Sequence, residues 1–184
     1  MTEGVWLVIG VQAAGKSTVA DLLARQFEHG VHVRGGQFYR WVVRGWVHAG
    51  DARADEARRL LDLRYRLAAL VADEYCAAGF CTVVQDNIFG ADVVMWLRAV
   101  RARPRHLVVL RPSVETVRSR DAARRALTGK IAYRPGEFGI TDLDGFLGET
   151  PRIGLWLDTS AQTAEQTVAE ILRRRSEALV PEHF

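Results

Sequence analysis

The segment Gly10–Ser17, with the sequence GVQAAGKS, directly follows the apolar run Val5–Ile9. It has the form G-x-x-x-x-G-K-[ST], in which small residues allow successive backbone N–H groups to wrap the phosphates of a nucleotide. In this pattern Lys16 reaches the β- and γ-phosphates, and Ser17 offers its hydroxyl to Mg²⁺. The apolar run before the loop predicts a strand. The chain is therefore constrained to a fold in which a strand delivers a phosphate-binding loop.

A helix is expected to follow the loop, from Lys16 to about Phe27. Apolar residues recur there at helical spacing, and Gly30 closes the segment. The positive end of this helix would point at the bound phosphates. Lys16 is also one of only two lysines among 25 basic residues, so lysine is used here where arginine is the rule. We expect the nucleotide to be bound by Gly10, Gln12, Ala13, Ala14, Gly15, Lys16, Ser17 and Thr18.

The composition is that of an ordinary globular domain. With 184 residues, 48% of them hydrophobic and 26% charged, the chain suits one domain over residues 1–184. Its net charge is only +3 and its arginines are spread out, so we do not expect a nucleic-acid partner. No stretch approaches the ~18 apolar residues of a membrane span. We expect a cytoplasmic protein in which Cys76 and Cys81 are reduced, buried thiols; the sequence does not indicate its oligomeric state.

Alternating strand and helix patterns predict an α/β fold. A long helix separates the second and third strand candidates, and we expect its stripe of Leu60, Leu63, Leu67, Leu70 and Val71 to face the core. The alternation is typical of a parallel sheet flanked by helices. The predicted strands are Val5–Ile9, Val31–Arg34, Cys81–Gln85, His106–Leu110 and Ile153–Leu157.

Ligands of open parallel sheets bind beyond the carboxyl ends of the strands. The third predicted strand runs into Asp86 and Asn87, which we expect to contact the acceptor. Asp86 would also lie beside Ser17 and hold Mg²⁺, directly or through water. The alternative is an aspartate that caps a turn or a helix.

Residues of about 118–148 are expected to form a lid. A helix with Arg120 and Arg124 on one face leads into an irregular, glycine-containing stretch, and such arginines supply positive charge over a transferring phosphoryl group. Alternatively, the two arginines form a solvated face paired with Asp121 or Glu115. After the fifth strand, Asp158 and Thr159 are expected to line an adenine or, alternatively, simply to begin the next helix.

The second strand leads into Arg34-Gly35-Gly36-Gln37, without a carboxylate. A kinase of this architecture usually has an aspartate here that takes the proton from the acceptor hydroxyl. The following Phe38 and Tyr39 would line an acceptor pocket with Gly36, or belong to the core. Loss of a base would slow phosphoryl transfer without abolishing it, since positioning and electrostatics carry most of that reaction.

In these motifs the chain resembles the chloramphenicol-phosphotransferase-like group of small P-loop kinases, in particular the actinobacterial AAA-family type. The resemblance implies an adenylate-kinase-like fold with a lid, use of ATP and Mg²⁺, and transfer of the γ-phosphate to a small-molecule hydroxyl. The family has an aspartate where this chain has Gly36. The segments that carry the resemblance are Gly10–Thr18, His32–Phe38, Arg66–Ala69, Val84–Asp86, Arg120–Arg124 and Thr150–Ser160.

The favoured function is therefore an ATP-dependent phosphotransferase acting on a small alcohol, an antibiotic or a metabolite. We expect Lys16, Asp86, Arg120 and Arg124 to be catalytic, with Asp86 taking over the proton transfer. Two alternatives stay open: a nucleotide-binding protein whose kinase activity is weak or lost, as Gly36 indicates, and a kinase for the 5′-hydroxyl of a polynucleotide.

Overall fold

The computed structural model describes residues 3–47, 53–129, 132–133 and 138–182. In these residues the core is one parallel sheet of five strands in the order β2-β3-β1-β4-β5. The first strand in the chain is therefore the central one, and the phosphate-loop segment leaves the middle of the sheet. The strands are β1 (Val5–Gly10), β2 (Gly30–Arg34), β3 (Cys81–Asp86), β4 (Arg105–Leu110) and β5 (Leu155–Leu157).

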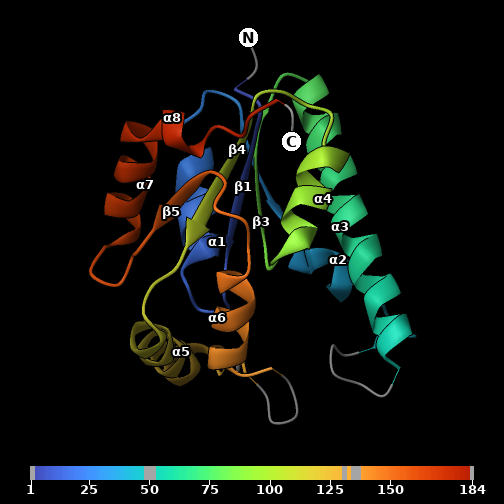
Figure 1. Cartoon of the computed structure of the whole chain (residues 1–184), viewed down its shortest axis with the longest axis vertical. Coiled ribbons are helices and arrows are strands. Elements are labelled where there is room, and N and C mark those ends of the chain that lie inside the picture. Colours follow the sequence, from blue (N-terminus) through green and yellow to red (C-terminus); the bar gives the residue numbers. More distant parts are fainter. Residues whose placement is uncertain (1–2, 48–52, 130–131, 134–137, 183–184) are drawn as a thin grey trace.

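Helices cover both faces of the sheet. Figure 1 shows α1, α7 and α8 on one side and α3 and α4 on the other, while α5 and α6 lie beyond the carboxyl ends of the strands. The predicted α/β fold with a five-stranded parallel sheet is confirmed. The helices are α1 (Lys16–Ala24), α2 (Gly36–Arg40), α3 (Ala54–Ala77), α4 (Ala91–Ala99), α5 (Val114–Thr128), α6 (Ile140–Gly148), α7 (Ala164–Arg173) and α8 (Arg175–Ala178).

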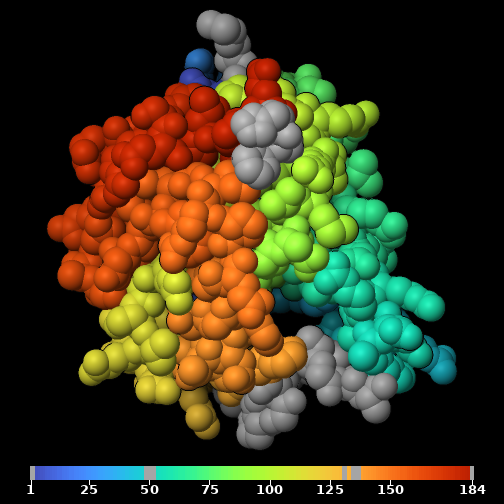
Figure 2. All heavy atoms as spheres, in the orientation of Figure 1, coloured from blue at the N-terminus to red at the C-terminus, as the bar shows by residue number. Residues whose placement is uncertain are grey.

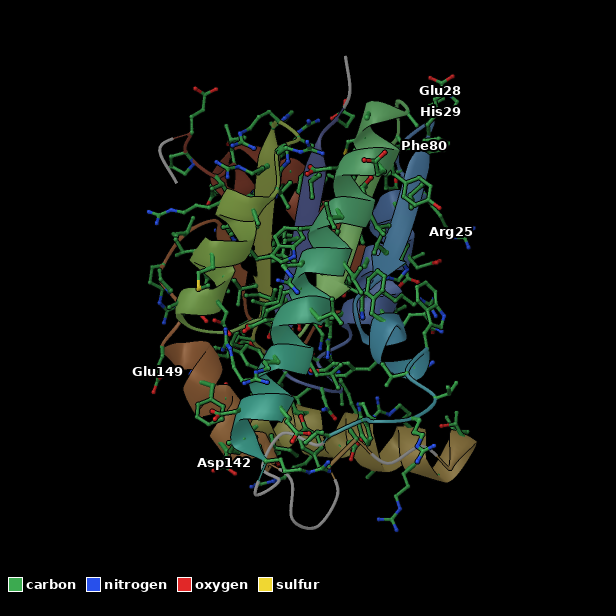
Figure 3. The ribbon with its side chains drawn as sticks, turned by 90° about the vertical axis from the view of Figure 1, so that its right-hand side faces the viewer. Arg25, Glu28, His29, Phe80, Asp142 and Glu149 are labelled. Carbon is green, nitrogen blue, oxygen red and sulfur yellow. The ribbon has the colours of Figure 1, made fainter. Side chains whose placement is uncertain are left out.

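The central strands β1 and β4 are buried along their whole length. This is why their sequences are nearly continuous apolar runs, as is typical of strands covered by helices on both faces. In the side view of Figure 3, α3 runs across the sheet. Glu28, His29 and Phe80 lie at one end of the molecule, and Asp142 of α6 lies toward the other. The carboxyl edge of the sheet is thus the edge faced by α5 and α6.

Two predicted boundaries shift by more than one residue. The helix after the loop ends at Ala24 instead of Phe27, and the last strand begins at Leu155 instead of Ile153. In the second case the cause is Gly154, whose φ of +72° is left-handed backbone that a regular strand does not contain. The thiols of Cys76 and Cys81 are free and buried, as expected.

The predicted core stripe of α3 is wrong in part. Leu63 and Leu70 are exposed, and the buried face carries small residues instead, among them Ala68, Ala69 and Ala72. Short side chains let the helix lie close to the sheet, which leaves no room for leucine on that face. The predicted helix is therefore present, but the face that packs against the sheet differs from the predicted one.

Of the predicted lid, residues 130–131 and 134–137 lie outside the described part of the chain. The helices α5 and α6 make up most of the rest. Arg111, directly after β4, holds α6 through a two-bond contact with Asp144, with Nε–Oδ1 and Nη2–Oδ2 distances of 3.0 Å. In the described residues no helix combines the length and the apolar character that a membrane crossing requires.

Candidate active site

The loop between β1 and α1 has the backbone of a phosphate cradle. Gly15 at the start of α1 has φ +96°, and Ala13 has φ +63°, a left-handed conformation that a non-glycine residue adopts rarely. Gly10 has no room for a side chain, because a Cβ there would lie 2.5 Å from the carbonyl oxygen of Leu110. The first turn of α1 contains no acidic residue. The positive end of the helix is therefore left for an anionic ligand.

Lys16 is buried, with 7% of its surface exposed, and its ammonium donates to the carbonyl of Val11 at 2.6 Å. Burial, together with the positive charges of Arg64 and Arg124, lowers its pKa to about 7. A buried ammonium beside two guanidinium groups is unfavourable unless an anion joins them. Lys16 therefore carries a buried positive charge at the phosphate loop, and Arg64 and Arg124 are close enough for their charges to affect its pKa.

The side-chain partner of Ser17 is Gln85 and not the expected Asp86. Its hydroxyl donates to Oε1 of Gln85 at 2.7 Å. Side chains alternate between the two faces of a strand, so neighbouring residues of β3 point in opposite directions. Gln85 faces α1, which carries Ser17, whereas Asp86 faces α3. Gln85 was not predicted from the sequence, although it directly precedes Asp86, the expected metal ligand.

Asp86 is held by Arg64 of α3. The guanidinium Nε donates to Oδ2 at 3.0 Å, Nη2 pairs with Oδ1, and the backbone N–H of Asn87 donates to Oδ1 at 2.6 Å. The Asp86 side chain is fully buried and that of Arg64 is 11% exposed. No sequence pattern singled out Arg64, because it is one arginine among several on a long helix. The pair is nevertheless the most buried ion pair at this edge of the sheet.

The two glycines after β2 differ in their surroundings. A Cβ at Gly35 would collide with the carboxylate of Asp86, so this glycine is required by close packing. At Gly36 an added Cβ would meet nothing within 4 Å. Phe38 is buried and packs edge-on against Trp41, which agrees with the core alternative. Tyr39 lies at the site, because its ring centre is 4.7 Å from the guanidinium carbon of Arg64.

The backbone of Asn87 continues this network, as its carbonyl accepts a hydrogen bond from Tyr65 at 2.9 Å. Asn87 therefore supports the site through its main chain.

The described lid residues contact the phosphate loop directly. Arg120 donates to the carbonyls of Ala14 at 3.3 Å and Thr159 at 2.7 Å. Tyr133, which was not predicted, donates its hydroxyl to the carbonyl of Gln12 at 2.6 Å. These bonds join the lid, the loop and the segment after β5. Arg120 thus acts here as a brace between the two predicted nucleotide-binding segments.

Arg124 pairs with Asp121 at 2.5 Å, as the alternative for this helix face proposed. Its charge still reaches Lys16, since it contributes to lowering the pKa of that lysine. Arg124 is therefore both ion-paired and close to the expected phosphates.

Asp158 and Thr159 have different environments. Asp158 is exposed and accepts bonds from the N–H and hydroxyl of Ser160, which lower its pKa. It therefore stabilises its own turn. Thr159 is 2% exposed, and its buried hydroxyl has no partner among the described residues. The backbone of Thr159, through Arg120, is what ties this turn to the phosphate loop.

Figure 2 shows a hollow on the molecular surface between α6 and the N-terminal half of α3.

The parallel sheet and the loop geometry define a P-loop protein with a kinase-type fold. The chain belongs to the AAA domain family, which matches residues 5–136. No curated protein matches the sequence significantly.

Solved structures share the fold. A sugar kinase from Janibacter sp. HTCC2649 aligns with a TM-score of 0.63 and 19% identity over 95% of each chain. The tunicamycin resistance protein of Deinococcus radiodurans aligns with a TM-score of 0.62 and 15% identity, covering 96% of this chain and 98% of its own. Shikimate kinase from Bacteroides thetaiotaomicron aligns with a TM-score of 0.58 and 13% identity, covering 94% of this chain and 96% of its own.

Proposed function

We propose that this protein is an ATP- and Mg²⁺-dependent phosphotransferase that moves the γ-phosphoryl group of ATP to a hydroxyl of a small molecule. The observation that carries the proposal is the surrounding of Lys16. Its ammonium is buried at the phosphate loop with the charges of Arg64 and Arg124 nearby. A triphosphate would satisfy these charges at once. The sugar kinase and shikimate kinase folds among the solved structures support the same class.

The donor nucleotide would be bound by the loop and braced by the lid. Lys16 would exchange its bond to Val11 for phosphate oxygens, and the free N–H groups at the start of α1 would contact the same phosphates. Arg124 would add positive charge from the lid. Arg120 and Tyr133 would keep water out by holding the lid against the loop. We infer that the chain works as one domain with residues 118–148 as the lid.

The residues around Ser17 fit a magnesium ion. The hydroxyl of Ser17 and the amide oxygen of Gln85 are hard oxygen ligands 2.7 Å apart, at the start of α1 where phosphates are expected. Bound there, Mg²⁺ would neutralise charge on the phosphate oxygens. A direct role for Asp86 would require its carboxylate to leave Arg64.

In the transfer, the acceptor oxygen forms a bond to the γ-phosphorus while the bond from that phosphorus to the bridging oxygen breaks, and ADP leaves with the electron pair. The acceptor proton passes to water, or to Asp86 if Arg64 releases it. The hollow between α6 and the N-terminal half of α3 is our proposed acceptor site, with Tyr39 and Gly36 of α2 as its proposed lining. Free thiols at Cys76 and Cys81 support a reducing compartment, the cytoplasm.

A second candidate is a nucleotide-binding protein with weak or no transfer activity. It is favoured by Gly36, which leaves no carboxylate after β2, and by Asp86, which is engaged by Arg64.

The test is a panel of hydroxylated antibiotics, sugars and other metabolites incubated with ATP and Mg²⁺, with formation of ADP as the readout. We expect at least one compound to accelerate ADP formation by the native chain and not by Lys16→Met. Binding of ATP without acceleration by any compound would favour the second candidate. Acceleration by oligonucleotide ends, with binding that weakens steeply with salt, would instead make the acceptor a polynucleotide.

A further inference from the structure

The guanidinium of Arg64 is held on one edge and one face. It is forked onto the carboxylate of Asp86 and lies over the ring of Tyr39. The carboxylate in turn is fixed by the N–H of Asn87 and pressed against Gly35. Such a planar group, held on one edge and one face, has lost most of its freedom before any ligand arrives.

This fixed guanidinium lies at the sheet edge from which the phosphate loop leaves, because its partner Asp86 pairs in register with Ile9, the residue before the loop. The charge of Arg64 is the largest electrostatic contribution to the lowered pKa of Lys16, ahead of that of Arg124. The two arginines belong to different parts of the fold: Arg64 to α3 beneath the sheet edge, and Arg124 to the lid helix α5. Lys16 is therefore influenced by one arginine from the predicted lid and by one from a helix that packs against the sheet.

Resting on the function proposed above, we propose that Arg64 is a catalytic residue that contacts the transferring phosphoryl group from the acceptor side, and that Asp86 is the residue that positions it. Charge develops on the equatorial oxygens of that group as it passes between donor and acceptor. A preorganised cation at this point stabilises the transition state more than the bound nucleotide. Of the two routes proposed above for the acceptor proton, this account keeps the transfer to water, because Asp86 stays bound to Arg64.

This positioning role gives a reason for the buried ion pair between Asp86, at the end of β3, and Arg64. Replacing a buried ion pair by apolar side chains is often neutral or stabilising, so the pair is weak evidence for a stability role. Its geometry instead fixes where the guanidinium lies.

The experiment uses Mg²⁺–ADP with and without aluminium fluoride, a mimic of the transferring phosphoryl group, and measures the dissociation constant of the nucleotide. In the native chain we expect aluminium fluoride to tighten ADP binding at least tenfold. The test variant is Arg64→Gln combined with Asp86→Asn, which leaves no buried charge unpaired. It should bind Mg²⁺–ADP within about threefold of the native chain and lose most of the tightening. Arg64→Lys should retain only part of it, because an ammonium cannot reproduce the fork.

The matched control is Arg58→Gln. Arg58 also lies on α3 and also forks onto an aspartate, Asp92, at 2.9 and 2.8 Å. We expect this variant to keep the full tightening. Native-like tightening in the double variant, or equal weakening of both ligands, would overturn the role of Arg64. Failure of the native chain to bind Mg²⁺–ADP at all would overturn the proposed function itself, so the two failures are distinguishable.

Discussion

The hydroxyl of Ser17 and the side-chain oxygen of Gln85 meet at 2.7 Å across the junction of α1 and β3. The position that faces the phosphate loop from β3 is thus held by a neutral amide, while the neighbouring carboxylate faces the opposite side of the sheet. If these two oxygens support Mg²⁺, the amide is a weaker ligand than a carboxylate would be.

We therefore expect Gln85→Glu to tighten the binding of Mg²⁺ in the presence of nucleotide and Gln85→Leu to weaken it about tenfold. The measurement is the Mg²⁺ dependence of nucleotide binding. The isosteric exchange Gln85→Glu adds charge without changing shape and serves as its own steric control. Equal Mg²⁺ dependence in all three proteins would exclude this position.

Lys16 lowers the free energy of unfolding, because folding buries its positive charge. Its pKa is about 7 in the folded chain and near 10.5 when exposed, so the unfolded chain binds more protons between these values and the free energy of unfolding rises with pH across that range. At pH 7 the cost is about 2–4 kcal/mol. Lys16→Met should therefore raise the melting temperature by several degrees, since 1 kcal/mol corresponds to about 2–4 °C at this size.

This gain should shrink as the pH is raised toward 10. Differential scanning calorimetry of the two proteins at several pH values measures it. Lys130→Met, which removes the other lysine of the chain, controls for the loss of one positive charge. A lower melting temperature of Lys16→Met would contradict this expectation and would mean that Lys16 stabilises the loop, for example through its bond to Val11.

Gly36 is where an aspartate can be added without steric cost, since its Cβ position is open. A carboxylate there would stand at the start of α2 and restore a candidate base, which typically accelerates proton transfer by about 10²–10⁴-fold. We expect Gly36→Asp to raise the turnover rate with an acceptor found in the panel. Gly36→Asn has the same shape without the charge and should not. A rise in both variants would point to backbone rigidity as the cause.

His106 is expected to make the free energy of unfolding depend on pH in the acidic range. Its ring is buried and stacks on Trp6, with centres 3.9 Å apart and planes 7° from parallel. Burial and the charge of Arg175 lower its pKa to about 4, although Glu3 acts in the opposite direction. The neutral form is favoured in the folded state, so its contribution to stability is present above pH 6.5 and is lost as the pH falls toward 4.

We expect the native chain to lose about 2–3 kcal/mol more than His106→Phe between pH 7 and pH 4. Phenylalanine keeps the stacking but does not bind a proton. Urea unfolding at the two pH values gives the difference, and parallel losses in both proteins would show that His106 is not the titrating group.

Local signals in the sequence were enough for much of the fold. The β1 run and the glycine-rich loop are each encoded within a few residues, and the structure contains both. The buried face of α3 was misassigned because helical spacing gives the period but not which stripe meets the sheet. Alanine and leucine stripes both fit it, and only the distance to the strands decides.

The site was harder to predict because its contacts join distant segments. Arg64 meets Asp86 across 22 positions, and Tyr133 meets Gln12 across 121. Neither arginines nor tyrosines in helices and loops carry a pattern that names such partners. The lysine and serine of the phosphate loop could be predicted, since their spacing is imposed by the phosphates themselves.

The most direct test follows the γ-phosphate itself. Radiolabelled ATP would be incubated with Mg²⁺, the native chain and the acceptor panel, and the label traced to acceptor, inorganic phosphate or unreacted ATP. The phosphotransferase account predicts that label appears on an acceptor and that Lys16→Met leaves it in ATP. Label that stays in ATP with every acceptor, although the nucleotide is bound, would contradict the account and leave a nucleotide-binding protein without transfer activity.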